Sequence, residues 1–230
     1  MNTTRTRPAL IPFWWMAWLG LLLLVFGGPL LVGRFMEISG EATRLALLEG
    51  RGVSASDLDV LARGRMRIAS WVHTSSLYND LSLVALERAE QPSMADSKET
   101  FYQEAEGWQL QALKVSPADP YGWFRLAYLL YIKKDGAPQA AEAWRQSLSS
   151  APYEPRLLLP RLQMALALGE TLDESSRHQI PRLVREAWGF DPSGLAKVAK
   201  AGNFSSVVEE ALRDDPQGLK HFQDQLDLLR

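Results

Sequence analysis

The pattern of hydrophobic and polar residues divides the chain into an uncharged N-terminal stretch and a long region of helical periodicity. From residue 41 onward, apolar residues recur at helical spacing, and no alternating strand pattern extends beyond a few residues. The first part of this region, at about 55–90, is either one long helix or two helices with a break near residues 73–76. The sequence therefore predicts an all-α protein with essentially no sheet.

Four acidic residues stand directly before prolines and predict where later helices begin. The prolines of these pairs are Pro120, Pro155, Pro192 and Pro216. An acidic side chain can accept a hydrogen bond from a first-turn amide, and proline is well tolerated in the first turn of a helix. The first two pairs are 35 residues apart. A period of this length is typical of a repeated helix pair.

The segment from 120 to 154 resembles a tetratricopeptide repeat, in which two helices stack on the next pair. The large and small residues of both helices fall at the spacing of that repeat: Trp123, Leu126, Ala127, Leu130, Ala140, Trp144, Ser147 and Pro152. The flanking segments match less well, because Gln109 replaces a large aromatic residue and Arg161 stands where an apolar residue is expected. The resemblance covers about residues 99–169 and implies an α-solenoid domain over residues 55–230, with a capping helix at 217–229.

Residues 10–33 are predicted to form a transmembrane helix. No charged residue occurs between Arg7 and Arg34, and this stretch would measure about 39 Å as a helix, enough for a hydrocarbon core of about 30 Å. A cleavable signal peptide is the alternative, but the run is long and offers no convincing cleavage site. We expect a cytoplasmic tail at 1–9, a juxtamembrane linker at 34–54, and a C-terminal domain in the periplasm, anchored in the bacterial inner membrane.

Composition and motifs give no indication of an enzyme. The formal net charge of −2 disfavours nucleic acid as a partner, and the chain has no cysteine. Its three histidines lie far apart, and no metal, dinucleotide, phosphate-loop or serine-nucleophile motif occurs. We therefore predict no catalytic residue, cofactor or metal. The cluster of Arg63, Arg65 and Arg67 is either a contact for lipid headgroups or an anionic polymer, or a solvated helix surface.

The helix expected after residue 119 carries a second stripe of aromatic residues beside its core stripe. In the tetratricopeptide family the corresponding positions line a concave groove, and the resemblance therefore implies a partner-binding groove. Alternatively, the chain's own helices fold over these rings, which would then be ordinary core. The candidate groove residues are Tyr121, Phe124, Tyr128, Tyr131, Arg156 and Gln163.

The sequence thus favours a non-catalytic, membrane-anchored scaffold that binds a partner protein of a cell-envelope assembly. The layout of one anchor and degenerate repeats also resembles small helical proteins of exopolysaccharide and other envelope-polymer export systems. One alternative is a polysaccharide-binding or glycan-processing protein, assisted by a carboxylate such as Glu142 or Asp119. Another is a purely structural spacer.

Overall fold

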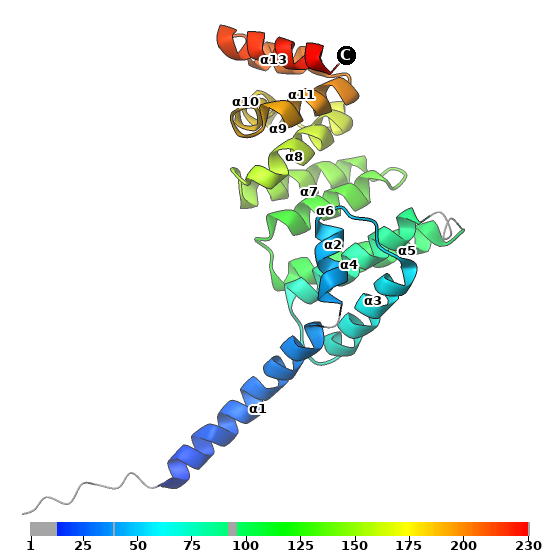
Figure 1. Ribbon diagram of the computed structural model, residues 1–230, viewed down its shortest axis with the longest axis vertical. Coiled ribbons are helices and arrows are strands. Elements are labelled where there is room, and N and C mark those ends of the chain that lie inside the picture. The colour runs from blue at the N-terminus through cyan, green and yellow to red at the C-terminus, as the bar shows by residue number, and fades with distance from the viewer. Residues whose placement is uncertain (1–12, 39, 92–95, 230) are drawn as a thin grey trace, which may run out of the picture.

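The computed structural model describes residues 13–38, 40–91 and 96–229, and every regular element within these ranges is helical. The prediction of an all-α protein is confirmed for this part of the chain. Figure 1 shows the helices piled into an elongated stack, with α1 projecting from one end and α13 closing the other. The elements are α1 (Phe13–Glu37), α2 (Glu41–Leu48), α3 (Ala55–Ala69), α4 (Ser75–Glu90), α5 (Lys98–Val115), α6 (Pro120–Tyr131), α7 (Ala137–Ser150), α8 (Pro155–Leu168), a 3-10 turn (Gly169–Thr171), α9 (Glu174–Arg177), α10 (Ile180–Phe190), α11 (Pro192–Ala201), α12 (Ser205–Ala211) and α13 (Pro216–Leu228).

The helices pack largely in sequential pairs, as a helical repeat requires. The most extensive contacts join α4 to α5 and α6 to α7, and further contacts connect each pair to the next along the stack. The segment at 55–90 is two helices, because α3 ends at Ala69 and α4 begins at Ser75. Thr74 stabilises the new start, since its hydroxyl accepts a hydrogen bond from the Leu77 amide over 3.4 Å.

All four acid–proline pairs mark a helix start, as predicted. Helices α6, α8, α11 and α13 begin at Pro120, Pro155, Pro192 and Pro216. In three of them the preceding aspartate caps the first turn, with carboxylate–amide distances of 3.0, 2.8 and 3.0 Å. Glu154, before α8, makes no such cap. Its longer side chain instead accepts a hydrogen bond from Tyr121 on α6.

The main core runs through the helices from α6 to α13 and is organised around Trp144. This side chain is fully buried, and its indole N–H donates to the Arg161 carbonyl over 2.9 Å. Leu126, Ala127 and Ala140 are buried as predicted, whereas Trp123 and Leu130 are half-buried. At the far end, α13 contributes Phe222, whose ring meets Trp188 edge to face at 6.0 Å.

Arg161 corrects the expectation that its position should be apolar. The residue is fully buried, and its guanidinium donates to the Ser147 hydroxyl and to the carbonyls of Ser147 and Ala151. These carbonyls lie at the C-terminal end of α7, where they have no partner within the helix and where a cation is favoured. A charged residue therefore occupies this core position because it caps the neighbouring helix.

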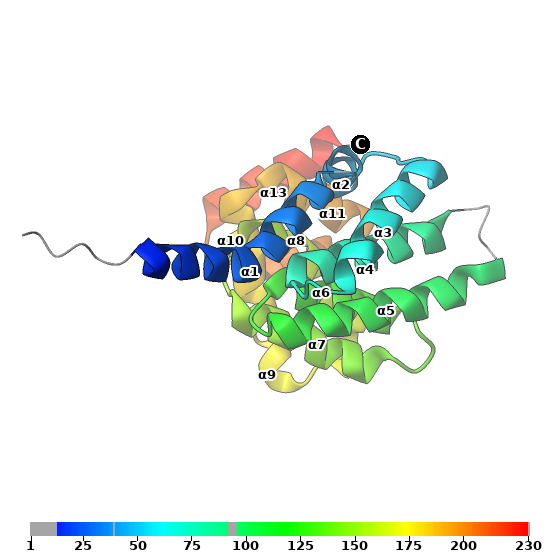
Figure 2. The same ribbon diagram turned by 90° about the horizontal axis from the view of Figure 1, so that it is seen from below.

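The N-terminal part of the described chain consists of α1 and α2. Figures 1 and 2 show α1 extending away from the stack, and it contacts α3 at its base. The predicted transmembrane segment, 10–33, lies partly outside the described residues. Within the described part, no helix has the length and apolar character needed to cross a membrane. The predicted tail at 1–9 also lies outside the described residues.

The stretch expected to be a linker, 34–54, contains α2. Gly40 precedes this helix with a φ of 89°, a conformation that favours glycine. A Cβ at this position would also lie 3.0 Å from the Leu61 side chain on α3. Gly40 thus permits the sharp turn that brings α2 against α3.

Candidate functional site

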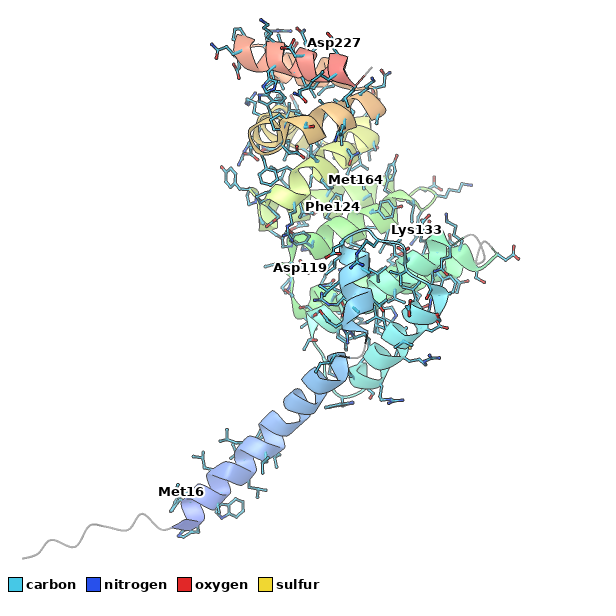
Figure 3. The ribbon with its side chains drawn as sticks, in the orientation of Figure 1. Met16, Asp119, Phe124, Lys133, Met164 and Asp227 are labelled. Atoms are coloured by element: carbon cyan, nitrogen blue, oxygen red, sulfur yellow. The ribbon has the colours of Figure 1, made fainter. Side chains whose placement is uncertain are left out.

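The candidate groove residues on α6 fall into two pairs with different environments. Tyr121 and Tyr131, at the two ends of the helix, are exposed by 40% and 39%. Phe124 and Tyr128, between them, are half-buried and pack against the main core. Figure 3 labels Phe124 and Asp119 at the level where α6 lies between the α4–α5 pair and α8. The inner rings are therefore partly structural, and the outer rings are available to a partner.

Tyr121 links the beginnings of α6 and α8. Its hydroxyl donates a hydrogen bond to Glu154 Oε1 over 2.6 Å. Partial burial, and then the hydrogen bond and charge of Glu154, raise the pKa of Tyr121 to about 12 against the opposing effect of Arg156 and Arg161. The phenol is therefore a fixed hydrogen-bond donor at neutral pH.

This environment predicts that Tyr121 ionises later than an ordinary tyrosine. In an alkaline titration followed by tyrosinate absorbance, the difference between wild type and Tyr121→Phe should show one group with a pKa of about 12. Glu154→Gln should move this transition toward the usual value of 10.0, because the carboxylate charge is removed. A transition unchanged by Glu154→Gln would contradict the assigned contact.

The two candidates on α8, Arg156 and Gln163, are both exposed. Arg156 lies close enough to Tyr121 for its charge to oppose the rise in the pKa of that tyrosine. The structure thus brings together an exposed phenol and an exposed guanidinium from consecutive helix pairs. We call the exposed side chains of Tyr121, Tyr131, Arg156 and Gln163 the α6–α8 face.

Sequence reasoning missed a cavity that borders this face and is lined mainly by polar residues. A cavity of about 310 Å³ lies between α2, α4 and α6, and Tyr121 is part of its wall. Arg125, in the same wall, donates through Nη1 to the Asn79 carbonyl and to Gln109 Oε1, each over 3.1 Å. The one sequence signal was Gln109, a polar residue in place of a large aromatic; it is fully buried and also donates to Asn79 Oδ1 over 3.0 Å.

The cluster of three arginines is divided by the structure. Arg65 is buried and its Nε lies 2.7 Å from Asp80 Oδ2, so it contacts no external surface. Arg63 and Arg67 are exposed, together with Met66 between them. The interpretation as a surface contact therefore concerns Arg63 and Arg67 alone.

The carboxylates considered for glycan chemistry have structural partners. Asp119 accepts from the Tyr121 amide and from Asn79 Nδ2, both over 3.0 Å. Hydrogen bonds from Gln146 and Arg145 lower the pKa of Glu142, the opposite of what a general acid requires. In the described ranges, no group of three or more histidine, aspartate or glutamate side chains is arranged to hold a metal ion.

Comparisons with known proteins supply no family for this chain. No family model matches it, and no curated protein matches it. The paired packing of the helices is consistent with a helical repeat. The resemblance to a tetratricopeptide repeat stays a prediction, which rests on the residues between 120 and 154.

Proposed function

We propose that this protein is a non-catalytic, membrane-anchored scaffold that binds a partner protein through the α6–α8 face. The observation that supports this most strongly is the exposure of Tyr121 and Tyr131 at the two ends of a helix whose inner rings are half-buried and pack against the core. Aromatic side chains offer large contact areas at small entropic cost, and their hydroxyls can bond to a partner. A rigid helix pair carrying such rings is suited to recognition.

The partner expected at this face combines an apolar surface with acidic groups. Tyr121 and Tyr131 supply the aromatic area, and Arg156 supplies an exposed positive charge beside Tyr121. Gln163 adds an exposed amide that can donate and accept. Complementary charge would increase the association rate and select among partners. A tetratricopeptide-like stack would present these groups in the manner of a groove for a helix or an extended segment.

The proposed anchor is the N-terminal apolar segment. The described side chains of α1 from Trp14 to Phe26 include large apolar groups that are each at least half exposed. Helices that are hydrophobic on all sides are typically surrounded by apolar material. Exposed Arg63 and Arg67 on α3, which contacts α1, and exposed Trp71 just after this helix are residues that favour a headgroup boundary. We place the domain on the periplasmic side of a bacterial inner membrane, in an envelope assembly such as one for polysaccharide export.

Photo-crosslinking in cells tests the scaffold proposal. Benzoyl-phenylalanine replaces Tyr131, and the matched control carries it at Gln223, an exposed position on α13 at the far end of the stack. We expect one dominant envelope protein to be captured from position 131 and not from position 223. Arg156→Glu should reduce this capture about 10-fold, which corresponds to a loss of roughly 1.4 kcal/mol.

The alternatives give different results in the same experiment. Capture of polysaccharide at position 131 would favour the glycan-binding function. Equal capture from both positions, or capture unaffected by Arg156→Glu, would contradict a specific protein-binding face. Crosslinks confined to the chain itself would favour a structural spacer.

A further inference from the structure

We propose that the cavity between α2, α4 and α6 binds an oxyanion, a carboxylate or phosphate group, through Arg125. The cavity measures about 310 Å³, large enough for a small ligand or for the end of a larger one. Its wall includes Arg44 from α2, Ser75 and Ser76 from α4, and Tyr121 and Arg125 from α6. This inference is independent of the proposed scaffold function.

The first support is the way the Arg125 guanidinium is held. Nη1 is fixed by the Asn79 carbonyl at 3.1 Å, Asn79 Oδ1 at 3.4 Å and Gln109 Oε1 at 3.1 Å. Among the described residues, no acceptor forms a hydrogen bond with Nε or Nη2 of Arg125. Neither atom is buried without a partner, so both remain accessible. These two groups form one edge of the guanidinium, with the spacing that pairs with two oxygens of a carboxylate or phosphate. The protein therefore orients Arg125 and leaves its paired donors open.

The second support is the charge of Arg125. No carboxylate in the described ranges lies within ion-pair distance of this side chain, and burial lowers its pKa. Charged groups removed from water are normally paired. An oxyanion in the cavity would supply a counter-charge in direct contact with the guanidinium.

Two carboxylates also line the cavity, and each already has partners. Asp80 pairs with Arg65 over 2.7 Å, and Asp119 accepts from the Tyr121 amide and from Asn79. Their charges act on Arg125 at longer range and favour its protonated form. They do not occupy the open edge of the guanidinium.

The opposite wall adds further groups suited to an anion. Ser75 and Ser76 belong to the first turn of α4, a helix of 16 residues, where amides without helical partners carry partial positive charge. Arg44 adds a second guanidinium, which Glu41 holds with contacts between 2.8 and 3.1 Å. The cavity thus combines hydroxyls, a helix N-terminus and two arginines around one space.

Thermal unfolding of the full chain in detergent, with acetate or inorganic phosphate added at constant ionic strength, tests this site. We expect the melting temperature of wild type to rise by roughly 3–6 °C at ten times the dissociation constant. Arg125→Lys keeps the charge but lacks the paired edge, so it should lose most of this rise. Arg213→Lys, at an exposed arginine just after α12 and outside the cavity lining, is the matched control and should retain it.

A second variant keeps the test decisive if Arg125→Lys does not fold. Ser76 is exposed in the first turn of α4, where an acidic residue is favoured, so Ser76→Asp should fold. The new carboxylate would repel an anion, so the rise in melting temperature on adding acetate or phosphate should disappear. A rise with phosphate alone identifies a phosphate site, whereas a rise with acetate identifies a carboxylate site. No rise in wild type, or an equal rise in wild type and Ser76→Asp, would overturn the proposal.

Discussion

Replacing Arg161 with alanine is expected to lower the free energy of unfolding by about 3–5 kcal/mol, the cost typical of breaking a buried charged network. Arg161 is fully buried, and its guanidinium bonds to the Ser147 hydroxyl and to the carbonyls of Ser147 and Ala151. Alanine would remove a charged donor from each of these acceptors and create a cavity beside Trp144. Urea unfolding followed by circular dichroism measures the loss.

Two further substitutions test whether the loss of stability comes from the hydrogen bonds of Arg161 or only from the loss of a positive charge. Burial lowers the pKa of Arg161 to about 10, so the side chain still carries its charge at neutral pH. Arg161→Lys keeps a charge but cannot reach all three acceptors, and it should fall between wild type and alanine. Arg145→Ala removes an exposed arginine from α7 and should change stability by no more than about 0.5 kcal/mol. A loss below about 1 kcal/mol for Arg161→Ala would contradict the capping role.

The helix starts were the most predictable part of this fold because their signals are local. Each acid–proline pair carries its own information: proline suits the first turn, and an aspartate reaches an amide two or three residues ahead. The stripe of Leu126 and Ala127 was equally readable, since periodicity fixes which side of α6 faces the core. These features need no knowledge of the neighbouring helices.

The features that sequence reasoning missed depend on residues distant in the chain. Arg161 looked misplaced because its acceptors are 10 and 14 residues away, on the end of another helix. Arg125 gave no signal, since its partners lie 46 and 16 residues away. The aromatic stripe of α6 was visible, but the burial of Phe124 and Tyr128 depends on packing against other helices.

Replacing Asp80 with alanine is expected to cost about 3–5 kcal/mol, because it breaks a buried ion pair while leaving its cation in place. Asp80 and Arg65 are 7% and 1% exposed, and their side chains meet over 2.7 Å between α4 and α3. After the substitution, the carboxylate near Arg65 would be that of Glu41, at 3.5 Å. The double variant Arg65→Met/Asp80→Leu removes both charges and should recover much of the loss. A double-mutant cycle in urea measures the coupling energy between Asp80 and Arg65. A double variant as unstable as Asp80→Ala would contradict the expected recovery.

The same pair predicts a pH dependence with a defined sign. Burial raises the pKa of Asp80 above its usual 3.8, and this effect exceeds the opposing effect of Arg65. A group whose pKa is higher in the folded protein contributes most to stability when protonated, and this contribution is lost as pH rises through the folded pKa. The stability of wild type relative to Asp80→Asn, which does not titrate, should therefore decrease from about pH 4 to neutral pH. An increase over this range would mean that the bond to Arg65 outweighs the cost of burying the carboxylate.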